Sequence, residues 1–146
     1  MTGVQTCALP IYGKLMRTLL SPYAKTMGFE ANHDAEGRLV ISMPYGDGVR
    51  GRPGFVHGGA LAGLLETVAY VTLSEALGED DTPMLKPVNM TATYMRGAVE
   101  VTTYARATIE RLGKRIANIE AVAWQDDPAK PVAIAQINVM LDRSGR

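Results

Sequence analysis

The sequence predicts a single α+β domain in which one long central helix is wrapped by a curved antiparallel sheet of five or six strands. The first reason is that one helical apolar pattern, at residues 57–77, is long enough for a core helix. The second is that alternating apolar and polar segments joined by short turns lie on both sides of it, two before and four after. Strands joined by short turns are antiparallel neighbours.

Composition excludes several classes of protein. The chain has 146 residues, 47% of them hydrophobic, with 15 basic and 15 acidic side chains. This balance disfavours a nucleic-acid partner bound by massed positive charge. One Cys and two His cannot form a structural zinc site, so we expect no metal and no cofactor apart from a substrate. The most apolar stretch, residues 58–73, carries Glu66 and is short for a membrane span. We therefore expect a cytoplasmic protein with no membrane partner.

The first eleven residues are treated separately. Residues 1–11 resemble one reading frame of a common sequencing adapter and are predicted to be non-native, an ordinary flexible N-terminus being the alternative. The single domain is predicted over residues 12–146. It opens with a weak helical pattern at 12–27, broken at Ser21-Pro22, and two strands at 29–33 and 38–45. A loop with four glycines follows at 46–54.

The second half of the domain is predicted to be sheet. Gly78 ends the central helix, because glycine is favoured just past a helix end. Strands are predicted at residues 84–95, 101–112, 116–125 and 132–141. A helix of 20 residues is about 30 Å long, and these strands reach about the same length. The sheet can therefore curl around the helix lengthwise.

The start of the central helix is the first candidate site. Two glycines follow His57 there, and the first N–H groups of a helix have no partner within it. With the positive end of the helix dipole, the amides of Gly58 and Gly59 can stabilise an oxyanion. The structural alternatives are that His57 simply bonds to the backbone at the helix start and that the glycines allow close packing.

Glu66 is the second candidate. It is the only charged side chain between Gly58 and Ser74, and no basic residue lies three or four positions away to pair with it. A carboxylate in such a setting can act as a general base, the alternative being a glutamate that faces solvent. Nine residues separate His57 from Glu66, about 13 Å along a helix. One helix cannot bring both to one atom, so we expect a second subunit to complete the site.

These residues carry a resemblance to a known family. The segment V-H-G-G at residues 56–59, followed by Glu66, resembles the hotdog-fold acyl-CoA thioesterases of the phenylacetate-degradation (PaaI-like) type, in the 4-hydroxybenzoyl-CoA thioesterase superfamily. Arg96-Gly97, the basic turn at residues 111–115 and the order of elements match as well, so the likeness covers about residues 29–141. It implies a hotdog fold.

The resemblance also implies an activity. An acyl-CoA thioester would be hydrolysed to a carboxylic acid and CoA without a metal, by a homodimer or a dimer of dimers. Glu66 would act as general base on water or as a nucleophile that forms an anhydride. The N–H of Gly58, and that of Gly59 as a second donor, would polarise the carbonyl, and His57 would orient the thioester. The open alternatives are a hotdog hydratase or dehydratase and a non-catalytic acyl-CoA-binding module.

The chain departs from the family at two positions. Many relatives carry Asn or Gln six residues before the His, where this chain has Gly51. Some relatives supply a Ser or Thr further along the helix. Thr67 and Thr72 are the candidates here, and Tyr70 occupies one position where a Thr is expected.

Substrate contacts are predicted from charge and from the apolar strands. Residues 86–115 hold six basic and two acidic side chains, and Arg and Lys bind the phosphates of CoA well. We assign Arg96 and Arg115 to phosphate binding, an ordinary solvated strand edge being the alternative. Tyr70 and Met90 are predicted to contact the substrate. The acyl pocket is expected between the helix and the facing strands, lined by Leu65, Ala69, Val88, Met90 and Tyr94.

Overall fold

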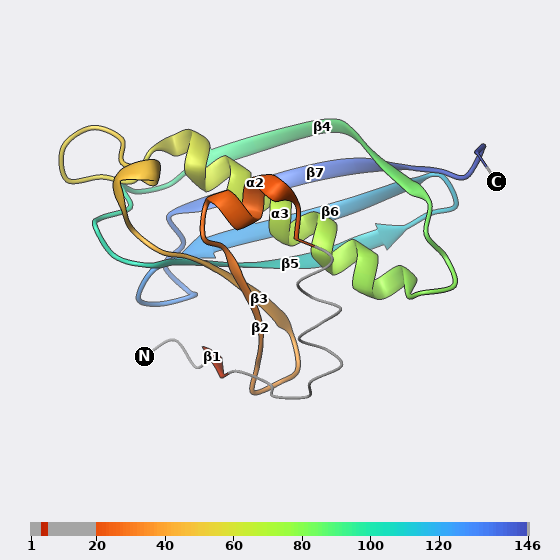
Figure 1. The fold of residues 1–146 in the computed structure, drawn as a ribbon, viewed down its shortest axis with the longest axis horizontal. Coiled ribbons are helices and arrows are strands. Elements are labelled where there is room, and N and C mark those ends of the chain that lie inside the picture. The colour runs from red at the N-terminus through yellow and green to blue at the C-terminus, as the bar shows by residue number, and fades with distance from the viewer. Residues whose placement is uncertain (1–3, 6–19, 146) are drawn as a thin grey trace.

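The protein, seen in a computed structural model, is described here over residues 4–5 and 20–145. One helix lies across one face of a seven-stranded antiparallel sheet with the strand order β1-β2-β3-β5-β6-β7-β4 (Figure 1). The elements are β1 (Val4–Gln5), α2 (Pro22–Thr26), β2 (Glu30–Asp34), β3 (Leu39–Met43), the 3-10 turn η1 (Asp47–Val49), α3 (Gly58–Leu77), β4 (Met84–Tyr94), β5 (Thr103–Leu112), β6 (Ile116–Trp124) and β7 (Ala133–Asp142).

The predicted fold class is confirmed. The central helix and the six predicted strands are present, with boundaries that differ from the prediction by at most two residues. The sheet has one strand more than predicted, because the two-residue β1 pairs with the end of β2. That strand falls within residues 1–11, most of which lie outside the described residues. Their assignment as non-native stays a prediction.

The start of α2 corrects the prediction for residues 12–27. We expected Ser21-Pro22 to interrupt a helix, but these residues begin one. The Ser21 side chain accepts a hydrogen bond from the Ala24 N–H at 3.2 Å, and Pro22 occupies the first turn, where its missing N–H costs nothing. Residues 12–19 of the predicted pattern lie outside the described residues.

Small side chains allow α3 to lie close to the sheet. The strands β5, β6 and β7 present fully or almost fully buried alanines to it. From the helix, Leu64, Leu65 and Val68 are fully buried against them. The helix is 20 residues long, four more than the apolar stretch at 58–73, and by length and composition it could cross a membrane. Half of its most apolar window is buried inside the protein, as in the core helix of a globular domain.

Strand β4 lies at the edge of the sheet and has one unpaired side. Its only partner among the described strands is β7, with a bulge between Pro87 and Asn89. Large apolar side chains are exposed along it, with Met84 65%, Val88 52% and Tyr94 52% accessible. An exposed apolar edge strand is a ready template for pairing with another chain.

Candidate active site

The loop before α3 holds the helix start in place through backbone hydrogen bonds. The His57 N–H donates to the Val49 carbonyl at 2.8 Å, and the Gly51 N–H donates to the Phe55 carbonyl at 2.9 Å. From the other side, the Val56 N–H donates to the carbonyl of Ala98 at 2.8 Å. The first turn of the helix is therefore fixed to two separate loops.

His57 caps the helix and accepts a hydrogen bond from one of the two amides predicted to bind an oxyanion. Its Nδ1 accepts the N–H of Gly59 at 2.8 Å, so this amide is not free and the prediction that it serves as a second donor is not supported by this geometry. The alternative that His57 simply bonds to the backbone at the helix start therefore holds for its Nδ1. Because Nδ1 accepts, the neutral ring carries its proton on Nε2. The N–H of Gly58, by contrast, has no partner among the described residues.

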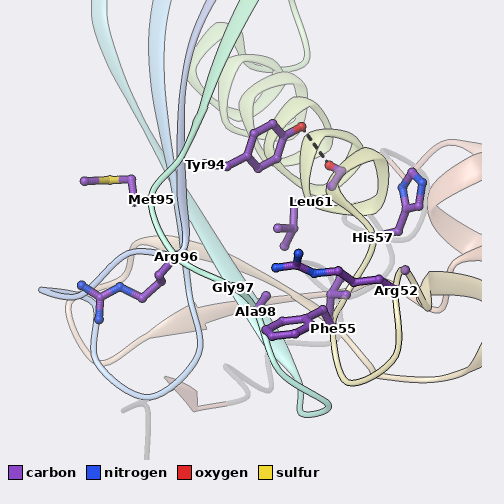
Figure 2. Close-up of a pocket in the computed structure, with 12 residues that line it drawn as sticks. Arg52, Phe55, His57, Leu61, Tyr94, Met95, Arg96, Gly97 and Ala98 are labelled. Atoms are coloured by element: carbon purple, nitrogen blue, oxygen red, sulfur yellow. Dashed lines mark hydrogen bonds between the residues drawn. The ribbon is translucent and has the colours of Figure 1, made fainter.

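Tyr94, at the end of β4, packs on the same glycine. Its hydroxyl donates to the Gly58 carbonyl at 3.0 Å (Figure 2). A Cβ at Gly58 would lie 3.4 Å from the tyrosine ring, which is ordinary contact, so an alanine would also fit there. The Tyr94 ring packs on Gly58, but its hydroxyl bonds the carbonyl and not the N–H. Close packing at Gly58 is therefore compatible with the predicted use of its N–H to stabilise an oxyanion.

Gly51 occupies a place where a side chain does not fit. A Cβ there would lie 2.9 Å from the Cα of His57 and 3.0 Å from its backbone nitrogen, closer than real Cβ atoms approach backbone. The Asn or Gln that relatives carry could not enter unless the loop moved. The family's side-chain amide is thus replaced here by a close contact between two backbone segments.

A pocket of about 510 Å³ opens beside the helix start. It lies between the loop before α3 and the segment that follows β4 (Figure 2). Among the predicted site residues it contains His57, Gly58 and Arg96. Sequence reasoning did not single out Arg52 and Phe55, which also line it. Nothing in the sequence pattern marks them, because they lie in a loop without periodicity.

Glu66 lies two turns further along α3, partly exposed on the side opposite the sheet. No ion pair or hydrogen bond joins it to another described residue. Burial raises the pKa of the Tyr70 phenol, and the nearby Glu66 carboxylate raises it further. The pKa of Tyr23 is raised by the same two causes in the same order. Glu66 is therefore flanked by two phenols and by no cation in the described part of the chain.

The other hydroxyl groups near Glu66 differ in their availability. The Tyr70 hydroxyl is buried and has no hydrogen-bond partner among the described residues, and the same holds for the Thr72 hydroxyl. The Thr67 hydroxyl donates to the Gly63 carbonyl at 2.7 Å and is already used within the helix. Thr67 therefore does not supply the family's free hydroxyl, and Tyr70 is the group beside Glu66.

The remaining predicted contacts do not gather at this pocket. Arg115 lies in the turn between β5 and β6, and lines a second cavity of about 700 Å³ at the other end of β4. Met90 is partly buried and packs against the core from β4. Leu65 and Ala69 are fully buried in the core. Of the residues expected to line the acyl pocket, Tyr94 alone is among the residues that line the cavity beside the helix start.

One long helix wrapped by a curved antiparallel sheet defines a hotdog fold, and solved structures agree. A Bacillus halodurans protein crystallised with CoA has a TM-score of 0.77 at 23% identity, covering 92% of this chain and 89% of that one. A Chromobacterium violaceum protein has a TM-score of 0.70 at 30% identity and covers 92% of both chains. A phenylacetic acid degradation-related protein of Ralstonia eutropha has a TM-score of 0.70 at 28% identity, covering 86% and 97%.

The sequence profile of the thioesterase superfamily matches residues 53–132, more than half of the chain. The chain belongs to the thioesterase superfamily, and the predicted resemblance is confirmed. This membership supports thioester hydrolysis as its class of activity. A search among curated proteins found no significant match.

Proposed function

We propose that the protein hydrolyses acyl-CoA thioesters to a carboxylic acid and free CoA. The observation that carries this proposal is the unpartnered Gly58 amide at the start of a long helix whose open face bears Glu66. The oxygen of water forms a bond to the thioester carbonyl carbon. The C–S bond then breaks, and the proton lost by water ends on the thiol of CoA. The reaction needs no other reactant.

In this proposal the Gly58 N–H binds the carbonyl oxygen as it gains negative charge. The helix dipole adds a partial positive charge at the same place. A proline at Gly58 would remove this N–H. It suits the first helical position, and His57, at φ −64° and ψ 134°, has the backbone conformation that precedes proline. We expect Gly58→Pro to lower kcat by about 10²- to 10³-fold. Gly58→Ala, which keeps the N–H, is the matched control.

Glu66 would act as the general base on water, or as the nucleophile that forms an anhydride. We expect Glu66→Gln to lower kcat by about 10²- to 10⁴-fold, because the amide can neither accept the proton nor attack. The measurement is thiol release from a panel of acyl-CoA substrates. Retained thiol release in this variant would contradict the assignment. Hydration of an enoyl-CoA without thiol release would indicate a hydratase, and binding alone would indicate a binding module.

We also propose that the site is shared between two chains. Gly58 and Glu66 are eight residues apart on one helix, about 12 Å along its axis, too far to act on one carbonyl. The free edge of β4 is suited to antiparallel pairing with a second copy. Such pairing would bring the beginning of the partner's β4 beside Tyr94. The partner's Arg115 would then lie about three strand spacings from Tyr94, roughly 14 Å.

Mixing two inactive variants tests this arrangement. Each mixed dimer of Glu66→Gln and Gly58→Pro chains would contain one intact site, so random exchange should restore about a quarter of wild-type activity. Sites built within one chain would show no recovery. Light scattering provides the independent check, and a monodisperse monomer would contradict the proposal.

A further inference from the structure

The guanidinium of Arg52 is held in the pocket by stacking. Its central carbon lies 4.5 Å from the centre of the Phe55 ring. The ring in turn lies against Gly97, where any Cβ would overlap it. Figure 2 shows Arg52 above Phe55 on the pocket wall, with Gly97 and Ala98 beside the ring. Gly97 thus leaves room for one edge of the ring, and the guanidinium of Arg52 lies over the ring's face.

Stacking leaves the N–H groups of Arg52 without a described partner. No hydrogen bond or ion pair joins Arg52 to another residue of the described chain. Its neighbour Arg50, in contrast, contacts Asp47 at 2.8 Å and Tyr45 at 3.3 Å. Arg96, which lines the same pocket, also has no acidic partner among the described residues. Two arginines without a counter-charge therefore share one pocket with the Gly58 amide.

We propose that Arg52, placed by Phe55 and Gly97, binds a phosphate group of the substrate's thiol carrier. This inference rests on the proposed function and adds a residue that sequence reasoning did not single out. A guanidinium presents a planar fork of donors that matches phosphate, and the ring fixes the plane of that fork. Less side-chain freedom is then lost on binding.

Three thioesters with one acyl group and shortened carriers separate the phosphates. Acyl-CoA has all of them, the 4′-phosphopantetheine thioester has one, and the pantetheine thioester has none. We expect Arg52→Gln to raise KM for acyl-CoA by about tenfold or more, with kcat little changed. KM for the pantetheine thioester should not change. Arg38→Gln removes an equal charge from the exposed turn between β2 and β3, outside this pocket, and should leave all three values unchanged.

The middle substrate identifies the phosphate. A rise in KM for the phosphopantetheine thioester assigns Arg52 to the phosphate next to the pantetheine arm. A rise for acyl-CoA alone assigns it to the phosphates of the nucleotide. An unchanged KM for acyl-CoA, or an equal rise for the pantetheine thioester, would overturn the proposal.

One further variant and one further measurement distinguish the role of the stack from a general loss of structure. Phe55→Leu keeps the charge of Arg52 but removes its platform, and should raise KM for acyl-CoA by a smaller factor with the same dependence on phosphate. Thermal unfolding followed by the fluorescence of Trp124, the single tryptophan, verifies that each variant is folded. Should the wild-type protein cleave none of the thioesters, the proposed function fails. Calorimetric binding of CoA and of pantetheine to wild type and Arg52→Gln then still tests the phosphate site.

Discussion

Both ends of β4 carry basic side chains, but their surroundings differ. At the end beside the helix start, Arg52 and Arg96 line a pocket without an acidic partner in the described chain. At the other end, the cavity beside Arg115 is bordered by ion pairs. Lys86 contacts Asp142 at 2.5 Å, and Arg143 donates to Asp81 at 2.7 Å.

This difference shows that local charge excess is a weak guide to a phosphate site. A paired cation is already compensated and gains little from an anionic ligand, whereas an unpaired cation at a pocket wall gains a full partner. The end beside the helix start therefore has the properties of a binding site. The far end contributes to binding only through Arg115 and its neighbour Lys114, and only if a second chain brings that turn to the pocket.

The largest expected effect comes from reversing one charge at each end. We expect Arg96→Glu to raise KM for acyl-CoA by at least tenfold, because it replaces an attraction to phosphate with a repulsion. Arg115→Glu should raise KM for acyl-CoA by a smaller factor, because Arg115 would contact only the substrate bound at the partner's pocket. Steady-state kinetics of both variants measures this, and an unchanged KM for Arg115→Glu would remove that residue from the substrate site.

A smaller effect is expected at the contact between β4 and the helix start. Tyr94→Phe removes the hydrogen bond to the Gly58 carbonyl while keeping the ring. One such bond contributes about 1 kcal/mol, so kcat should fall about fivefold as the glycine becomes less well positioned. KM should change little, and the unfolding temperature should fall by a few °C. Tyr104→Phe, on a ring stacked with Trp124, is the control. Equal kcat values for the two variants would contradict a positioning role for Tyr94.

At the far end, removal of a paired cation should affect stability and not catalysis. The hydrogen bond from Lys86 holds the pKa of Asp142 well below its usual value, and bonds from Ser144 lower it further. A depressed carboxyl pKa stabilises the fold above the unfolded pKa, near 3.8, and the contribution is lost as pH falls below it. Lys86→Met should lower the unfolding temperature by at most a few °C at pH 7. The difference from wild type should shrink in acid, and a constant difference would refute this account.

The smallest expected effect is spectroscopic. Because the Glu66 carboxylate contributes to the raised pKa of Tyr70, Glu66→Gln should move that pKa back toward 10.0 without reaching it, since burial remains the larger cause. Alkaline titration of tyrosinate absorbance measures the shift, and Tyr70→Phe identifies which transition belongs to this residue. A titration unchanged in Glu66→Gln would mean that the carboxylate does not lie beside the phenol.

The fold could be predicted from sequence because its signals are local. Alternation along residues 133–142 and the helical pattern after His57 each follow from a few neighbouring residues. Ser21-Pro22 was misread because proline breaks a helix in its interior but favours its first turn, and the pattern alone does not say which position it holds.

Of the residues that line the pocket, sequence reasoning reached the helix start, Tyr94 and Arg96, and missed the loop before the helix. Gly58 follows from the unpaired amides of any helix start, but the availability of Gly59 depends on which way the His57 ring turns. Arg52 could not be found, because the ring beneath it, Phe55, is placed by contact with Gly97, 42 positions away from Phe55 in the sequence. Arg96 and Arg115 were grouped by charge, although a whole strand length separates them within one chain.

The contact between Gly51 and the backbone of His57 has a consequence for redesign of this protein. Introducing the glutamine of related enzymes at position 51 would not recover their chemistry, since its Cβ would push the first turn of α3 away from the amide it is meant to assist. An inserted residue between positions 46 and 50 would have to come first, to give the loop a wider path. At position 51 of this chain, loop path and side-chain identity must therefore change together.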